Sequence, residues 1–286
     1  TGGEVGWTVF GGYVDKTGEA QNNQVTVTGG STCNLFGGHV EFGNADGNIV
    51  NLNNGTVKEQ LFGGFVFDGN ANKNTVTVAG GSVGDAVYGG YAHGSGNADK
   101  NTVTVTGGTV KDVYGGLSKS GSASENTVDL GAVTVTGDVI GGSAKNGTDN
   151  TLIVHSHAAG ASISDFSGVQ NIRFYIENDA VSAATPMLRL GVNGKDLTGI
   201  GIGVGVSGGA KVLDVGESIR LMQTQSGSGL TTDPAKNQIT GEHGVSVRYH
   251  LDIKKQQTIP RRRRTGRRQP LGSAASGIAC KKRRRD

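Results

Sequence analysis

The sequence predicts an all-β fold, a right-handed parallel β-helix or β-solenoid with coils of about 26 residues. An aromatic residue or Ile followed by Gly-Gly recurs at equal intervals of 26, with the first glycine at Gly11, Gly37, Gly63, Gly89, Gly115 and Gly141. A second motif, Ala-x-x-Asn, precedes alternating Val and Thr, as in "NTVTVT" from Asn101. With 51 glycines among 286 residues and 5% aromatic content, one unit has too few large side chains to fold alone.

Each unit is expected to contain two clear strands. The Val/Thr run after the Asn has the period of two that is typical of a half-buried strand. We expect Val76 and Val78 to face inward, with Thr77 facing water. A turn, often Gly-Gly, leads to a second strand that ends at the aromatic residue. Each inward Val or Phe should pack on its counterpart one coil away, and the repeated Asn should form an amide ladder.

Other repeat folds fit the spacing less well. A propeller blade needs roughly 40–50 residues, and a leucine-rich repeat needs a Leu ladder that is absent here. If the coils stack, the aromatic residues of successive coils must line up along one axis. These residues are Phe36, Phe62, Tyr88 and Tyr114.

The chain divides into three parts by pattern and charge. Residues 1–154 hold the regular repeats, and residues 155–253 read as less regular C-terminal coils and a cap, with alternation such as "NIRFYIE" from Asn171. Residues 253–286 contain 13 Lys or Arg and one acid, whereas residues 1–252 contain 14 basic and 23 acidic residues. The acidic body should not bind nucleic acid, so any such binding would come from the tail.

Residues 254–286 are predicted to be a disordered basic tail. Their composition breaks abruptly after Ile253, which favours a shifted reading frame, and the alternative is a genuine basic tail. The opening "TGGEVGWTVFGG" begins partway through a repeat, so the chain is expected to be a fragment or a processed piece. No run of 18 apolar residues occurs, so no membrane-spanning helix is expected.

Several segments resemble the passenger domain of bacterial autotransporters. They are the repeat "NTVTVTGGTVKDVYGG" (101–116) and, in the same order as at the end of such passengers, "MLRLGVNGKDLTGIGIGVGV" (187–206), "VGESIRLMQT" (215–224) and "GVSVRYHLDI" (244–253). The resemblance covers about residues 1–253. It implies a β-helix exported through an outer-membrane β-barrel of the same polypeptide and displayed on the bacterial cell surface. Relative to this family, the chain is expected to be a fragment without the signal peptide and the barrel.

The expected function is therefore that of an extracellular, non-catalytic structural stalk or adhesin, which serves adhesion or aggregation. The implied partners are host or bacterial surface glycans or proteins, together with the barrel of the full-length protein. The alternative is a β-helical polysaccharide-processing enzyme, whose site would need clustered carboxylates. Asp15 and Glu41 share a position four residues after the first glycine, but Phe67 takes that position in the next coil.

No catalytic residue, cofactor or metal is predicted. His155 and His157 have the spacing of a metal-binding pair on a strand, without a visible third ligand. A polar outer face is the preferred interpretation of this pair.

The candidate binding residues are aromatic. They are Tyr13, His39, Phe65 and Tyr91, each two residues after the first glycine of its coil, and Leu117 continues the register. This register favours an internal aromatic stack. The alternative is a binding ridge for a partner or a carbohydrate on the variable edge of the coils.

Overall fold

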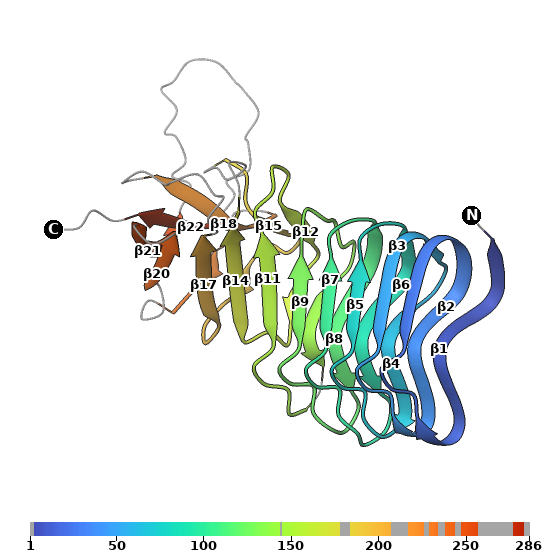
Figure 1. Cartoon of the computed structure of the whole chain (residues 1–286). Helices are drawn as coiled ribbons and strands as arrows, with labels where there is room; N and C mark the ends of the chain where they lie inside the picture. Colours follow the sequence, from blue (N-terminus) through green and yellow to red (C-terminus); the bar gives the residue numbers. More distant parts are fainter. Residues whose placement is uncertain are drawn as a thin grey trace.

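The computed structural model describes residues 3–143, 145–177, 184–206, 217–225 and 229–233, and the backbone of the strands at 238–243, 247–256 and 277–282. Parallel strands stack into a β-solenoid of about eight turns, which confirms the predicted all-β solenoid. The coils follow one another along a single axis, with the two ends of the chain at opposite ends of the stack (Figure 1). The described residues contain no helix, and hence none that could cross a membrane.

One continuous sheet of 14 strands wraps around the regular coils. The long strand β2 pairs with β3 along its first half and with β4 along its second half, so it joins two faces. We call them the aromatic face (β1, β2, β4, β6, β8 and β10) and the valine face (β3, β5, β7, β9 and β11). Their bounds are β1 Glu4–Glu19, β2 Gln24–Asn44, β3 Ile49–Val57, β4 Leu61–Asp68, β5 Thr75–Val78, β6 Ser82–Ala92, β7 Thr102–Val105, β8 Thr109–Ser118, β9 Thr127–Leu130, β10 Val139–Ser143 and β11 Thr151–His155.

The pairing places equivalent residues of successive coils opposite one another. Phe36 pairs with Phe62, Phe62 with Tyr88, and Tyr88 with Tyr114. The centroids of these rings lie 4.6, 4.9 and 4.7 Å apart, close to the spacing of paired strands. The predicted alignment of the aromatic residues along one axis is therefore confirmed.

The main core runs the length of the solenoid between the two faces. Val76, Val78, Val103 and Val105 are fully buried in it, as predicted. The aromatic-face strands contribute mostly Leu or Val to the same cluster, namely Leu35, Leu61, Val87, Val113 and Val139. The expectation that the aromatic residues also point inward is wrong, because Phe62 and Tyr88 belong to a separate cluster.

The later coils bury larger side chains than the repeats. Phe166, Ile172, Phe174 and Leu188 are all fully buried. The strands that carry these coils are β12 Ala161–Ile163, β13 Phe166–Ser167, β14 Asn171–Ile176, β15 Leu188–Leu190, β16 Lys195–Asp196, β17 Gly201–Val206, β18 Ser218–Thr224 and β19 Leu230–Thr231.

A second sheet of six strands lies at the C-terminal end. Its parallel strands β12, β15 and β18 are extended by antiparallel pairing of β18 with β22 and of β22 with β21. The last strands are β20 Gln238–His243, β21 Val247–Gln256 and β22 Gly277–Lys282. Of residues 254–286, the segment predicted as a disordered tail, only residues 254–256 in β21 and 277–282 in β22 are described. The rest of that segment lies outside the described residues, so disorder there stays a prediction.

Candidate functional site: the aromatic face

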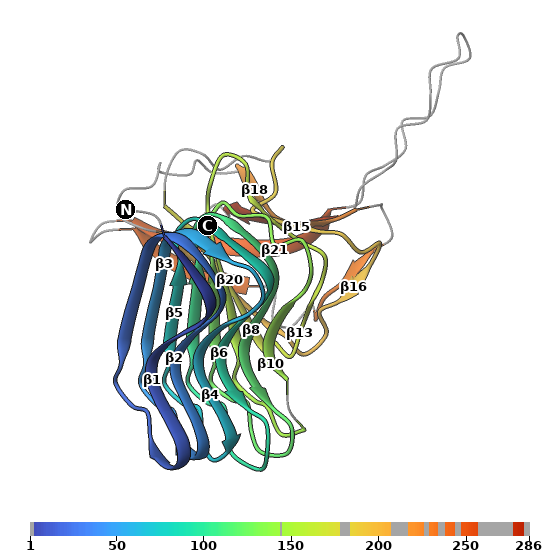
Figure 2. The same cartoon turned by 90° about the vertical axis from the view of Figure 1, so that its right-hand side faces the viewer.

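The long strands of the aromatic face, such as β1 and β2, are bent along their length (Figure 2), and each strand of this face carries a Gly-Gly pair. In β4, both glycines point into the coil. A Cβ on Gly63 would lie 2.8 Å from the Cβ of Asn74 on the opposite side, and a Cβ on Gly64 would lie 2.6 Å from its Nδ2. Two successive inward residues break the alternation of the strand, so Phe62 and Phe65 both lie on its outer side. The glycines thus form a waist at which the two sides of the coil meet.

The waist separates the main core from a smaller one. The smaller core is made of residues that are mostly Ala and Val, all nearly inaccessible to water: Ala20, Val40, Ala45, Val66, Ala71 and Ala92. Phe62 and Phe65 flank the waist from outside, and their ring centroids are 5.4 Å apart. The rings therefore fill the concave bend that the glycines create.

An asparagine ladder occupies the waist, as predicted. The side chains of Asn48, Asn74, Asn101, Asn126 and Asn150 are fully buried. Asn74 Nδ2 donates to Asn101 Oδ1 at 3.1 Å, and the backbone N–H of Asn74 donates to the same oxygen at 2.9 Å. The pattern repeats in each coil, and it ends where the backbone N–H of Asn150 donates to Gln170 Oε1. The ladder thus satisfies buried amides that would otherwise be costly.

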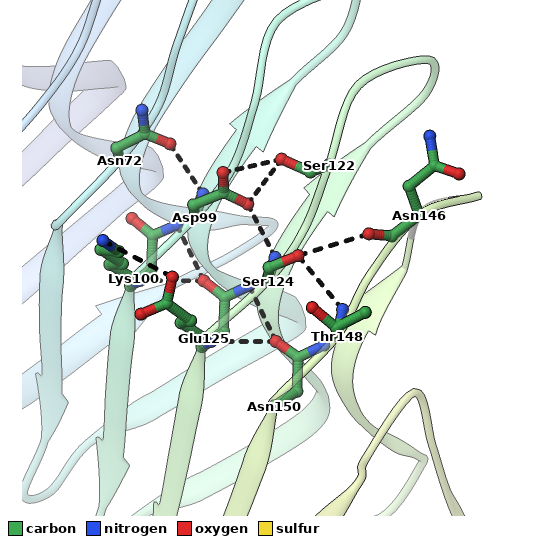
Figure 3. A network of polar contacts seen from close by, with 11 residues as sticks. Asn72, Asp99, Lys100, Ser122, Ser124, Glu125, Asn146, Thr148 and Asn150 are labelled. Carbon is green, nitrogen blue, oxygen red and sulfur yellow. Dashed lines mark hydrogen bonds and ion pairs between the residues drawn. The ribbon is translucent and has the colours of Figure 1, made fainter.

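The turn before each ladder residue has a left-handed backbone. The φ values are 56° at Asn22, 57° at Lys73, 60° at Lys100, 55° at Glu125 and 58° at Asp149. Polar side chains bridge neighbouring turns, and Asp99 Oδ1 accepts from the backbone N–H of Ser124 at 2.7 Å (Figure 3). The turns therefore hold their strained conformation through contacts between coils.

The first aromatic column lies just before the glycines and consists of Phe10, Phe36, Phe62, Tyr88 and Tyr114. Successive rings are nearly parallel, with interplanar angles of 21°, 9°, 7° and 18°. Phe62 is only 3% exposed and Tyr88 only 8%. Because neighbouring rings cover both faces of each inner ring, this column serves cohesion between coils.

The second aromatic column contains the four predicted site residues. Ring centroids are 5.2 Å apart between Tyr13 and His39, 5.1 Å between His39 and Phe65, and 5.2 Å between Phe65 and Tyr91. Tyr13 is exposed and the other three are half-buried. The rings contact one another in sequence, stacked at Tyr13–His39, tilted at His39–Phe65 and edge-on at Phe65–Tyr91, and they lie on the outer surface of the coil and not inside it. That they bind a partner stays a prediction.

Burial keeps this surface uncharged. It raises the pKa of the Tyr88, Tyr91 and Tyr114 phenols above the ordinary value and lowers the pKa of the His39 imidazole. The hydrogen bond that the Tyr13 hydroxyl donates to Asp15 Oδ1, 3.0 Å long, raises the pKa of Tyr13. Near neutral pH the two columns therefore present uncharged rings.

A third column, the charge row, lies two residues beyond the second column. It consists of Asp15, Glu41, Phe67, His93 and Lys119. The last four side chains point outward, because the residue before each of them is buried: Val40, Val66 and Ala92 in the smaller core, and Ser118 in the following coil. Asp15 is exposed. In the sequence, Asp15, Glu41 and Phe67 share the position four residues after the first glycine of each coil. Following that position into the next two coils, to His93 and Lys119, would have identified the complete charge row.

The predicted histidine pair is not formed as a pair on one strand. Strand β11 ends at His155, and His157 lies beyond it. His155 Nε2 lies 2.9 Å from Asp129 Oδ1, and His155 Nδ1 lies 2.8 Å from Glu177 Oε1. Burial raises the pKa of the Asp129 carboxyl. In the described part of the chain, no group of three His, Cys, Asp or Glu side chains is arranged to hold a metal ion.

The aromatic face as a whole offers contacts at fixed intervals of about 4.8 Å along the axis. Such a surface suits a long partner that lies along the solenoid, more than a small molecule that enters a cavity. Comparisons of the chain with models of known protein families, with curated proteins and with solved structures find no match.

Proposed function

We propose that the chain is a non-catalytic, extracellular stalk or adhesin, the passenger domain of a bacterial autotransporter displayed at the cell surface. The observation that carries the proposal is the unbroken stack of coils with an aromatic outer face. The repeated residues serve stacking, and the residues that differ between coils lie on the exposed edge, where they are available to a partner.

The partners that fit are glycans or proteins of a host or bacterial surface. Tyr13 and Phe67 are 51% and 44% exposed, so the aromatic face offers ring surface to a ligand. The acidic body disfavours nucleic acid.

Binding to whole bacterial and epithelial cells, measured by flow cytometry with labelled protein, tests the proposal. Tyr13→Ser and Tyr91→Ser should lower binding several-fold, since aromatic anchors dominate such contacts. Ile49→Ser is the matched control, because Ile49 is similarly exposed but lies on the valine face. Equal binding by all variants would refute a role for the aromatic face, and no binding to any cell would refute the adhesin.

Phe65→Ser separates the two roles of the second column. A large loss of thermal stability would assign Phe65 to the stack, whereas unchanged melting with lost cell binding would assign it to a ridge. Contacts with Phe62 and Tyr91 lead us to expect the first result.

The alternative, a polysaccharide-processing enzyme, has less support. An open cleft of about 320 Å³ lies over β12, β15 and β18. It is lined by Arg189, Gln223 and Gln225 among others, and none of the described lining residues carries a carboxylate. Glycoside hydrolysis needs two carboxyl groups. Release of reducing ends from surface polysaccharides, abolished by Glu41→Gln, would favour the enzyme.

A further inference from the structure

The charge row changes sign along the solenoid axis. Asp15 and Glu41 stand on the first two coils, Phe67 on the third, and His93 and Lys119 on the fourth and fifth. Strand pairing fixes this order, because Val14 pairs with Val40, Val40 with Val66, Val66 with Ala92, and Ala92 with Ser118. In the first coil a register shift between Val14 and Thr17 places Asp15, together with its neighbour Lys16, opposite Glu41. One strip of surface therefore runs from acidic to basic through an exposed phenyl ring.

This order is self-complementary. A two-fold axis through Phe67 would place Asp15 opposite a second copy's Lys119, and Glu41 opposite its His93. Because coils are equally spaced, both pairs come into register together. We infer that two copies of this chain associate side by side and antiparallel through the charge row. The inference rests on the proposed function, for which it names a partner of the same face.

The centre of the row is apolar. Phe67 is 44% exposed and packs at 5.2 Å on Phe65 and at 5.5 Å on His93. Its outer side would meet the same ring of the second copy. A pair of phenyl rings that loses water at the middle of a polar strip is the usual arrangement of a small protein interface.

The basic end is preset for hydrogen bonding. Lys119 Nζ lies 2.6 Å from His93 Nε2, and an ammonium group can only donate. His93 Nε2 is then the acceptor, which leaves its Nδ1–H as the donor toward a second copy's Glu41. At the acidic end, the Tyr13 hydroxyl donates to Asp15 and orients that carboxylate.

A second copy fits this strip better than a polyanion or a polycation. Either polymer would be attracted by one end and repelled by the other, whereas the antiparallel copy satisfies both ends. The Asp15–Lys119 contact is an exposed ion pair, which contributes roughly 0.2–1 kcal/mol, and the Glu41–His93 contact is a hydrogen bond. Each contact occurs twice, so association should be weak, and its ionic part should decrease with added salt.

Sedimentation velocity of the full chain, at low and at high salt, tests the inference. Asp15→Lys and Lys119→Asp alone should each weaken self-association about tenfold, because each puts like charges together twice. The double variant D15K/K119D should associate as the unmodified chain does, since it only exchanges the partners of each pair. An equimolar mixture of the two single variants should form a mixed dimer for the same reason.

Two matched controls exclude effects of bulk charge and hydrophobicity. Lys100→Glu removes an exposed lysine from a turn outside the row and should leave association unchanged. Phe67→Ser should weaken association, whereas Phe42→Ser should not, although Phe42 is 52% exposed. Melting curves of every variant check that the solenoid is intact.

A chain that stays monomeric at low salt would overturn the inference, as would a double variant no better than the single ones. Cell binding by Tyr13→Ser and Ile49→Ser variants is scored separately. A monomer that still binds cells through the aromatic face would refute the dimer and leave the proposed function standing. A chain that dimerises but binds no cell would refute the proposed function and support the inferred dimer.

Discussion

The regular repeats and the C-terminal coils solve the same packing problem in different ways. In the repeats, like residues stack on like, as Val76 does on Val103, and a buried asparagine is present in every coil. In the later coils, unlike residues pair, and Phe174 lies between Val154 and Val204. The repeats thus gain cohesion from identical contacts between small side chains. The C-terminal coils gain their cohesion from large buried side chains that fill the interior, and this packing does not require a perfect repeat.

The largest effect should come from the waist of a repeat. Gly63→Val would place a Cβ 2.3 Å from Gly89 O and 2.8 Å from Asn74 Cβ. Because one of these atoms belongs to strand β6 and the other to the turn before β5, we expect a loss of about 4 kcal/mol or more in the free energy of unfolding, measured by chemical denaturation. Gly29→Val is the control, since nothing lies within 4 Å of its Cβ position. Equal stability of both variants would show that the waist is not tightly packed.

The C-terminal core should be the next most sensitive. Phe174→Ala removes a fully buried ring from β14 and should cost about 3–5 kcal/mol. Val103→Ala, at an equally buried site in the repeats, should cost only about 2 kcal/mol, because fewer buried carbons are lost. A larger loss of stability for Val103→Ala than for Phe174→Ala would contradict the proposed difference between repeats held by stacked small side chains and C-terminal coils held by large buried ones.

The asparagine ladder should contribute a smaller, local effect. Asn101→Ala leaves the backbone N–H and the Nδ2 of Asn74 without their acceptor, and we expect a loss of about 2–3 kcal/mol. Asn70→Ala removes one acceptor, used by the backbone N–H of Asn97 in a partly buried turn. That variant should lose about 1 kcal/mol. Similar losses of stability in the two variants would mean that burial in the waist does not increase the contribution of these hydrogen bonds to stability.

The smallest effect should be the pH dependence contributed by His39. Burial lowers the pKa of its imidazole, so the folded state binds a proton less readily than the unfolded state. Stability is then highest above the unfolded pKa of about 6.5 and falls as the pH drops below it. His39→Phe should therefore reduce the loss of melting temperature between neutral and mildly acidic pH. An unchanged pH profile would contradict this assignment.

Much of the repeat region could be predicted from sequence spacing. The interval between glycines identifies which residues of successive coils pair, and alternation identifies Val76 and Val103 as core. The direction of the aromatic residues could not be predicted, because alternation fails where Gly63 and Gly64 both point inward. Contacts of His155 were also missed, since Asp129 and Glu177 lie on neighbouring coils in a region where the period fades.

The asparagine ladder gives the solenoid a direction. From Asn48 to Asn126, each side-chain amide donates to the Oδ1 of the ladder asparagine in the following coil, so the small dipoles of these side chains add along the axis. A coil exchanged within this part of the stack must keep the same direction, because a reversed side-chain amide would bring its Oδ1 against the Oδ1 of its neighbour.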